Sequence, residues 1–182
     1  LMLEGKPWPK PSGLGLGVGG PYRRPHPRRE GMKDPKARLV DMNSEGIEVA
    51  VLFGGGIGGT IPALEDAAFA AELARARNTW VAEYCSANPA RLKGTAALPQ
   101  QDIPAAVAEL RRTVTELGFV GVSLLPNLGG RHMGDPYFFP IYKEAERLNV
   151  PICVHMFLGR YGSEATGTMR VDKFFYSHLF GH

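Results

Sequence analysis

Two kinds of hydrophobic pattern alternate along the chain from residue 34 onward. Short, nearly continuous apolar runs are typical of strands buried on both faces, and they lie at 47–53, 92–98, 119–125 and 150–154. Longer segments with apolar residues three and four positions apart are typical of amphipathic helices, and they lie at 36–45, 63–87, 102–117 and 135–148. Strands that alternate with helices in this way predict a parallel sheet covered by helices.

Residues with strong local preferences mark the ends of several of these elements. Gly46 and Gly118 are expected to end helices in the left-handed conformation. Asp102 and Asp135 are expected to cap the helices that follow them, each with a proline in the first turn. For the longest helix the apolar spacing predicts a buried face formed by Phe69, Leu73, Ala76, Trp80 and Tyr84.

The pattern of elements leaves two architectures open. Four parallel strands fit either an open doubly wound sheet or half of a closed barrel. Residues 1–33 are dense in Gly and Pro and show no period, so we interpret them as a loop region and 34–182 as the folded domain. Because the chain begins at Leu1 and stops inside an aromatic-rich run at His182, we interpret it as a fragment.

Composition narrows the class of protein. Of the 182 residues, 44% are hydrophobic and 21% are charged, which is typical of a globular domain. The sequence contains no run of about 18 apolar residues, so no membrane-spanning helix is expected. Cys85 and Cys153 are too far apart to form a CxxC pair, so a disulfide framework is not expected and a reducing, cytoplasmic setting fits best.

Charge is distributed unevenly along the chain. Residues 1–38 hold nine Lys/Arg and three Asp/Glu, a balance of 9 − 3 = +6, whereas the whole chain carries only +3. This segment could be read as a nucleic-acid-binding arm. Since no recognition helix or base-stacking aromatic residues follow it, we favour a solvated loop and expect no nucleic-acid partner.

The strongest candidate for chemistry is His155, which ends the apolar run at 150–154. In parallel α/β folds, functional residues gather at the carboxyl ends of strands, and a neutral imidazole there is a good metal ligand. The alternative is a structural, hydrogen-bonded histidine. Because side chains alternate along a strand, Cys153 is expected to share the face of His155 as a small buried thiol.

Other candidates follow neighbouring strands. Gly54–Gly59 formally matches G-x-G-x-x-G, but Thr60-Ile-Pro62 separates it from the next helix, so we favour a loop over a dinucleotide site. Arg131 could bind a substrate carboxylate through its guanidinium fork, and His132 could carry a proton, although both could be solvated loop residues. His178 and His182 form at most a weak metal pair.

A set of short motifs, in order and spacing, resembles the amidohydrolase-related family of metal-dependent enzymes, whose members include aminocarboxymuconate-semialdehyde decarboxylase and gamma-resorcylate decarboxylase. The resemblance covers about residues 34–182, most of the chain, and the motifs that carry it are 38–47, 49–53, 78–84, 89–94, 98–99, 116–122, 135–138, 145–148 and 150–155.

This resemblance implies a fold and a set of site residues. The fold would be an incomplete (β/α)₈ TIM barrel containing about strands two to five. His155 matches the metal ligand that ends the fifth strand, and Phe157 matches an aromatic residue near the substrate. One divalent ion is implied, zinc as the first expectation and manganese as the alternative. The catalytic histidine after the sixth strand would lie beyond His182.

The resulting functional hypothesis is a metal-dependent hydrolase or non-oxidative decarboxylase acting on a small unsaturated or aromatic carboxylic acid. Arg131 and Phe53 would line its pocket, the fragment alone would be inactive, and a homodimer is expected because decarboxylases of the family often form one. Two other hypotheses remain open. One is a nucleotide-binding module that uses Gly54–Gly59, and the other is a barrel relative that has lost its metal ligands.

Overall fold

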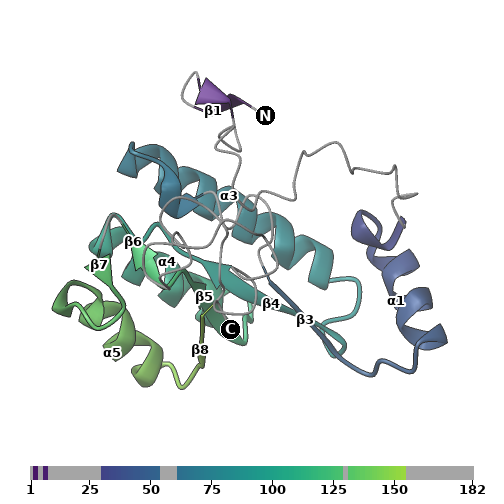
Figure 1. The fold of residues 1–182 in the computed structure, drawn as a ribbon. Helices are drawn as coiled ribbons and strands as arrows, with labels where there is room; N and C mark the ends of the chain where they lie inside the picture. The colour runs from purple at the N-terminus through teal and green to yellow at the C-terminus, as the bar shows by residue number, and fades with distance from the viewer. Residues whose placement is uncertain (1, 4–5, 8–29, 54–60, 129–130, 155–182) are drawn as a thin grey trace, which may run out of the picture.

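A four-stranded parallel sheet forms the centre of the computed structural model, which describes residues 2–3, 6–7, 30–53, 61–128 and 131–154 (Figure 1). The strands lie in the order of the sequence, and they are β3 (Ala50–Leu52), β4 (Leu92–Ala97), β5 (Gly121–Leu124) and β8 (Ile152–Val154). Each is joined to the next by a helical connection, which confirms the predicted parallel α/β fold.

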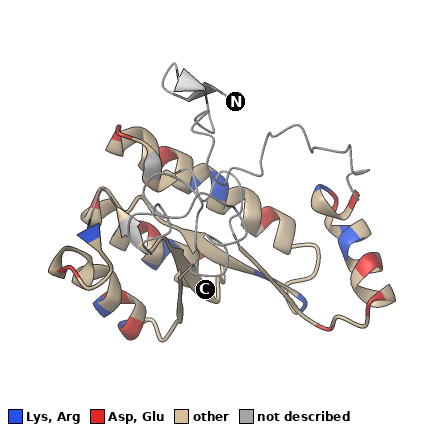
Figure 2. Ribbon diagram, in the orientation of Figure 1, with Lys and Arg blue, Asp and Glu red and all other residues tan. Residues whose placement is uncertain are grey.

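Four α-helices and three short 3₁₀ helices are described. The α-helices are α1 (Pro35–Ser44), α3 (Ala67–Cys85), α4 (Ile103–Thr115) and α5 (Phe139–Arg147). The 3₁₀ helices are η1 (Glu30–Met32), η2 (Ile61–Ala63) and η3 (Pro136–Phe138). None of these helices has the length and hydropathy that a membrane crossing requires. Charged residues of both signs are interspersed along the α-helices (Figure 2).

Two-residue antiparallel ladders complete the secondary structure. One joins β1 (Met2–Leu3) to β2 (Lys6–Pro7), and the other joins β6 (Asn127–Leu128) to β7 (Arg131–His132). The second ladder lies in the segment that follows β5, which the sequence predicted as a loop. Arg131 and His132 are therefore held in a hairpin by main-chain pairing.

The predicted helix ends are confirmed in atomic detail. The carboxylate of Asp102 accepts a hydrogen bond from the backbone N–H of Ala105, and Asp135 caps η3 by accepting from Tyr137. Gly46 and Gly118 follow α1 and α4 with φ of 70° and 69°, a conformation in which a side chain on Cβ would be strained.

The hydrophobic core lies between one face of the sheet and the helices. Alternate residues of β4 and β5 point toward the helices and are fully buried, among them Leu92, Ala96, Val122 and Leu124. They pack against α4 and α5 through residues such as Leu110 and Ile141.

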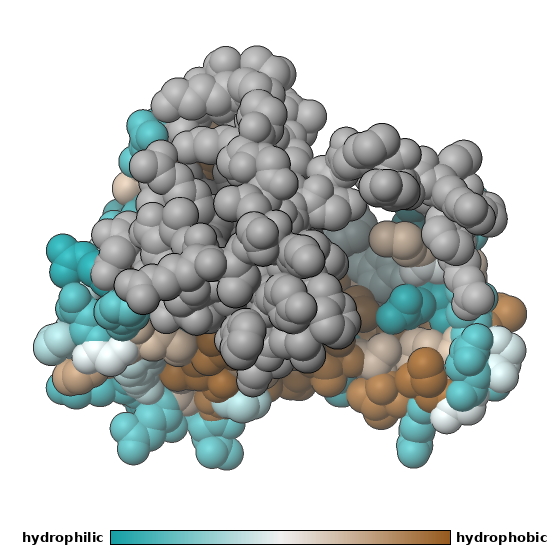
Figure 3. Space-filling model, in the orientation of Figure 1, coloured by the Kyte–Doolittle hydropathy of each residue, from teal (hydrophilic) through white to brown (hydrophobic). Residues whose placement is uncertain are grey.

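The opposite face of the sheet is less covered at its edges. Val51, in the middle of β3, is 45% exposed, and Figure 3 shows hydrophobic residues at the surface in the lower middle of the view. Gly121 and Cys153 share this face, because a Cβ built on Gly121 would lie 3.9 Å from the sulfur of Cys153. Cys153 is half-buried there, so the prediction of a small buried thiol is only partly right.

The predicted buried face of the long helix is displaced by about one residue along most of its length, although Tyr84 is buried as predicted, at 8% exposed, and Leu73 is half-buried. Phe69 and Trp80 are 41% and 55% exposed, whereas Ala70, Ala74 and Asn78 are completely buried. One residue corresponds to a rotation of about 100° on a helix. The cause is close packing, because the small side chains let α3 approach the sheet while Phe69 and Trp80 lie beside the contact.

The strands are shorter than their apolar runs predicted, and Arg91 explains this for the first of them. Its guanidinium donates hydrogen bonds to the carbonyl oxygens of Ile47 and Glu48, at 2.7 and 2.9 Å, and to the side chain of Asn43 at 2.7 Å. Those carbonyls are thus bonded to a side chain, and the ladder of β3 begins only at Ala50.

Candidate functional site at the carboxyl edge of the sheet

The carboxyl ends of the four strands form one edge of the sheet, where parallel α/β folds place their functional residues. β3 stops early at this edge. Leu52 lies opposite Gly94, so Thr95 and Ala97 of β4 extend beyond the end of β3. The hydroxyl of Thr95 donates to the carbonyl of Leu52 at 2.9 Å. The carbonyl of Thr95 and both main-chain groups of Ala97 lie beyond this ladder and need other partners, because a buried peptide group without one is costly.

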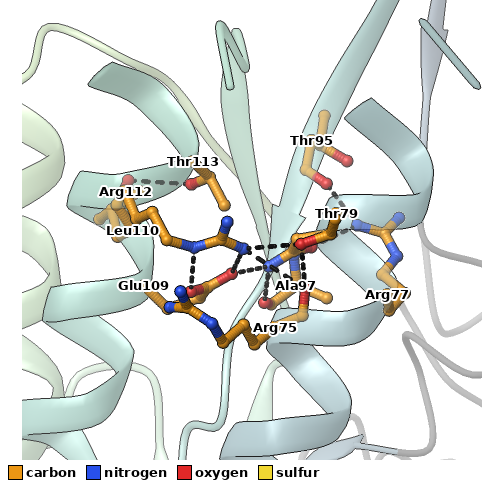
Figure 4. A network of polar contacts seen from close by, with 10 residues as sticks. Arg75, Arg77, Thr79, Thr95, Ala97, Glu109, Leu110, Arg112 and Thr113 are labelled. Carbon is orange, nitrogen blue, oxygen red and sulfur yellow. Dashed lines mark hydrogen bonds and ion pairs between the residues drawn. The ribbon is translucent and has the colours of Figure 1, made fainter. Parts of the chain in front are cut away.

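Side chains of α3 supply these partners (Figure 4). The amide of Asn78 accepts from the N–H of Ala97 at 3.0 Å and donates to its carbonyl at 2.9 Å. The guanidinium of Arg77 donates to the carbonyl of Thr95 at 2.7 Å and to the amide oxygen of Asn78 at 2.8 Å. Asn78 therefore bonds Ala97 as a neighbouring strand would.

A second layer of charged residues from α4 fixes this amide. Glu109 accepts a hydrogen bond from Asn78 at 2.9 Å and is held by two hydrogen bonds from Arg112, at 2.7 and 2.8 Å. Burial lowers the pKa of Arg77 to about 10, so its guanidinium remains protonated at neutral pH. The hydrogen bond with Glu109 raises the pKa of Arg112. Both arginines thus stay charged and keep their donors.

A glutamine side chain pairs with main-chain groups in the same way between the segments that follow β4 and β5. The side-chain amide of Gln100, which is 2% exposed, accepts from the N–H of Leu125 at 2.9 Å and donates to its carbonyl at 3.4 Å. The next residue, Gln101, donates to the carbonyls of Ile61 and Leu64 at 2.9 and 3.1 Å. The segment after β4 is thereby bonded to the segments after β3 and β5.

These buried amides were missed by the sequence reasoning, although one signal was present. Asn78 falls on the same helical face as Ala70 and Ala74, at intervals of four residues. A polar residue at an inward position of an alanine-rich face indicates a buried hydrogen-bonding role. No comparable periodic signal marks Gln100, which lies in a turn.

Comparison with known proteins identifies the family. Residues 7–178 match the amidohydrolase family, which is nearly the whole chain. The chain belongs to the amidohydrolase family. This confirms the resemblance drawn from the sequence motifs.

Three relatives of this amidohydrolase chain are informative. A 2-amino-3-carboxymuconate-6-semialdehyde decarboxylase from Dictyostelium discoideum is 30% identical over 155 residues, covering 81% of this chain and 39% of the relative. A gamma-resorcylate decarboxylase from Rhodococcus jostii is 40% identical over 105 residues, covering 52% of this chain and 32% of the relative.

The third relative is a solved structure. It is a 5-carboxyvanillate decarboxylase from Novosphingobium aromaticivorans with bound manganese and a nitrobenzoic acid, with a TM-score of 0.67 and 28% identity over 78% of this chain and 42% of that one. The chain thus spans 32–42% of the length of these three relatives. The observed parallel α/β fold is accordingly a half-barrel of the amidohydrolase TIM-barrel type.

The structure describes some of the residues predicted for the site and not others. Phe53 follows β3 and is 44% exposed. The side chain of Arg131 is 52% exposed, with Nη1 3.5 Å from a carboxylate oxygen of Asp135. His132 beside it is exposed. The remaining candidates, His155, Phe157, Gly54–Gly59, His178 and His182, lie outside the described residues.

The described part of the amidohydrolase chain does not by itself fit a metal ion. Among its residues, no three His, Cys, Asp or Glu side chains lie close enough together to hold one. A catalytic zinc site uses about three protein ligands, so a metal site of this chain would depend on residues outside the described ranges.

The described residues do not test the nucleotide-binding hypothesis. A dinucleotide fingerprint requires a helix that starts at its last glycine, and that glycine, Gly59, lies outside the described residues. The helices described after it are η2 and α3, which begins at Ala67.

Proposed function

We propose that the protein carrying this half-barrel is a metal-dependent non-oxidative decarboxylase that acts on a small aromatic carboxylic acid. The observation that carries the proposal is the family match over residues 7–178 together with relatives named gamma-resorcylate and 5-carboxyvanillate decarboxylase. The parallel half-barrel supports it, because TIM-barrel enzymes build their sites at the carboxyl ends of the strands.

His155 is proposed as one ligand of a divalent metal ion. β8 is described as far as Val154, and His155 is the next residue in the sequence. Ile152 packs toward the helices, and strand alternation predicts that position 155 shares the opposite face with Cys153. The ion would polarise the substrate's carboxylate or carbonyl. Zinc and manganese are the two candidates for this ion, and the manganese bound in the solved relative supports manganese.

Three further residues are proposed to line the substrate pocket. The guanidinium of Arg131 is accessible on its hairpin and would bind the substrate's carboxylate through two parallel hydrogen bonds. Phe53, exposed after β3, would form an apolar wall, and Phe157 would contact the aromatic ring. A cytoplasmic location and a homodimer complete the proposal, and no nucleic-acid or membrane partner is included.

Metal content and turnover of the full-length protein test the proposal. We expect close to one Zn or Mn per protein by elemental analysis, and release of carbon dioxide from gamma-resorcylate or 5-carboxyvanillate. His155→Ala should lose the metal, whereas His132→Ala, the histidine control, should retain it. A metal-free wild-type protein, or metal retained in His155→Ala, would contradict the assignment.

A further inference from the structure

A chain of contacts connects Arg131 to the rest of the carboxyl edge. The guanidinium carbon of Arg131 lies 4.6 Å from the ring centroid of Tyr137, a cation–π distance. The accompanying ion pair with Asp135 is long, at 3.5 Å. The ring of Tyr137 is therefore the better defined support for this exposed arginine.

Tyr137 is itself held at several points. Its hydroxyl donates to the main-chain carbonyl of Gln101 at 2.9 Å, and its backbone N–H donates to Asp135 at 2.9 Å. Its ring packs edge-on against Phe138, with centroids 5.1 Å apart, and Phe138 is only 2% exposed. The ring that supports Arg131 is thus fixed to the hydrophobic core on one side and to the segment after β4 on the other.

Gln101 is anchored in turn. Its side-chain amide donates to the carbonyls of Ile61 and Leu64, in and just after η2. The segments that follow β3, β4 and β5 are therefore joined through Gln101 and Tyr137. Because these hydrogen bonds use main-chain carbonyls, they fix the backbone of the edge as well as its side chains.

We propose that Tyr137 is a positioning residue that holds Arg131 ready for the carboxylate of the substrate, with Gln101 as its anchor. The inference rests on the proposed function and assigns Tyr137 a role within that site. A free arginine side chain loses rotamer freedom when it binds a ligand. Stacking on a fixed ring restricts the arginine before the substrate binds, so less rotamer freedom is lost on binding. We therefore expect Tyr137 to affect mainly the affinity for the substrate.

The chain offers a matched control for Tyr137. Tyr142 is also half-buried, and its hydroxyl also donates to a main-chain carbonyl, that of Met133 at 2.6 Å. The cation–π contact of Arg131 is with the ring of Tyr137 and not with that of Tyr142. Tyr137→Phe and Tyr142→Phe therefore each remove one hydroxyl hydrogen bond from the same region, and only the first loosens the ring beneath the guanidinium.

Steady-state kinetics of the full-length enzyme distinguish the two variants. We expect Tyr137→Phe to raise KM by about 3- to 10-fold, the effect of losing one neutral hydrogen bond, with kcat changed less than twofold. Tyr142→Phe should keep both values within about twofold of wild type, and the two variants should melt at similar temperatures. Equal KM values for the two variants would overturn the inference.

A double-mutant cycle tests whether Tyr137 acts through Arg131. In an Arg131→Ala background, Tyr137→Phe should cause no further rise in KM. An undiminished effect in that background would assign Tyr137 a separate role and contradict the inference. If the wild-type protein decarboxylates neither substrate, the proposed function fails and this inference fails with it, whereas an active enzyme with additive variants overturns the inference alone.

Discussion

Replacing Asn78 by alanine should destabilise the protein far more than the loss of one ordinary surface hydrogen bond. The substitution leaves the N–H and carbonyl of Ala97 without their partners in a region where Asn78 is completely buried. An unsatisfied buried polar group costs about 1–3 kcal/mol. Two such groups therefore predict a loss of roughly 4 kcal/mol, a large part of the about 5–15 kcal/mol that stabilises a typical protein.

Thermal unfolding monitored by circular dichroism measures this loss. At about 2–4 °C per kcal/mol for a chain of this size, Asn78→Ala should melt roughly 10 °C below wild type. Thr115→Ala is the matched control, because the Thr115 hydroxyl donates to the main-chain carbonyl of Arg111 on the exposed side of α4. That control should stay within about 2 °C, as is usual for surface substitutions.

A second variant separates hydrogen-bond chemistry from side-chain volume. Asn78→Asp preserves the size and the acceptor toward Ala97 N–H, but it replaces the donor with an oxygen that faces the carbonyl of Ala97 and the carboxylate of Glu109. We expect it to be at least as destabilising as Asn78→Ala. If both variants melt within 2 °C of Thr115→Ala, the hydrogen bonds of Asn78 to Ala97 do not stabilise the protein as we infer.

Two further substitutions test the packing of the helices and the sheet. Glu144 accepts hydrogen bonds from two arginines, which lower its pKa to about 2, so its contribution is complete above about pH 4.5 and declines as pH falls toward 2. Because its arginine partners are exposed to solvent, Glu144→Gln should lower the free energy of unfolding, measured in urea, by only about 1–2 kcal/mol at pH 7. At pH 3 the loss should be less than half of that. An equal loss at both pH values would contradict a stabilising role for the ionised Glu144 carboxylate. A Cβ on Gly94 would lie 2.6 Å from the ring of Phe119, so Gly94→Ala should cost about 1–3 kcal/mol through overpacking. Gly134→Ala, where a Cβ meets nothing within 4 Å, should be nearly neutral, and similar melting of the two alanine variants would argue against the steric account.

Features decided by local chemistry could be predicted from the sequence. The caps at Asp102 and Asp135 and the left-handed stops at Gly46 and Gly118 depend on residues within one turn of one another, and all four are observed. The alternation of strands and helices likewise predicted the parallel sheet, because a buried strand and an amphipathic helix differ in hydrophobic period.

Features decided by contacts between distant segments could not be predicted in this way. The spacing of Phe69 and Trp80 indicates where large side chains lie, but the alanines determine where α3 approaches the sheet. The late start of β3 depends on Arg91, 41 residues after Ala50. For the candidate site, the sequence placed Arg131 in the segment after the correct strand, and it placed Phe53 at the end of a strand, where the structure has it one residue after β3. It gave no sign of the hairpin that carries Arg131 or of the tyrosine that contacts its guanidinium.

The two buried amides at the carboxyl edge suggest how this half-barrel combines separated strand ends with a fixed backbone. A functional site between strands needs their ends to diverge, and divergence leaves main-chain groups without ladder partners. A primary amide carries a donor and an acceptor like those of a peptide group. Asn78 satisfies both main-chain groups of Ala97 in β4, and Gln100 satisfies both of Leu125, directly after β5. A carboxylate lacks the donor and a hydroxyl is too short to span both groups. We therefore expect an amide side chain to be required at positions 78 and 100. Asn78→Asp and Gln100→Glu should both destabilise the protein, although each keeps the shape of the side chain.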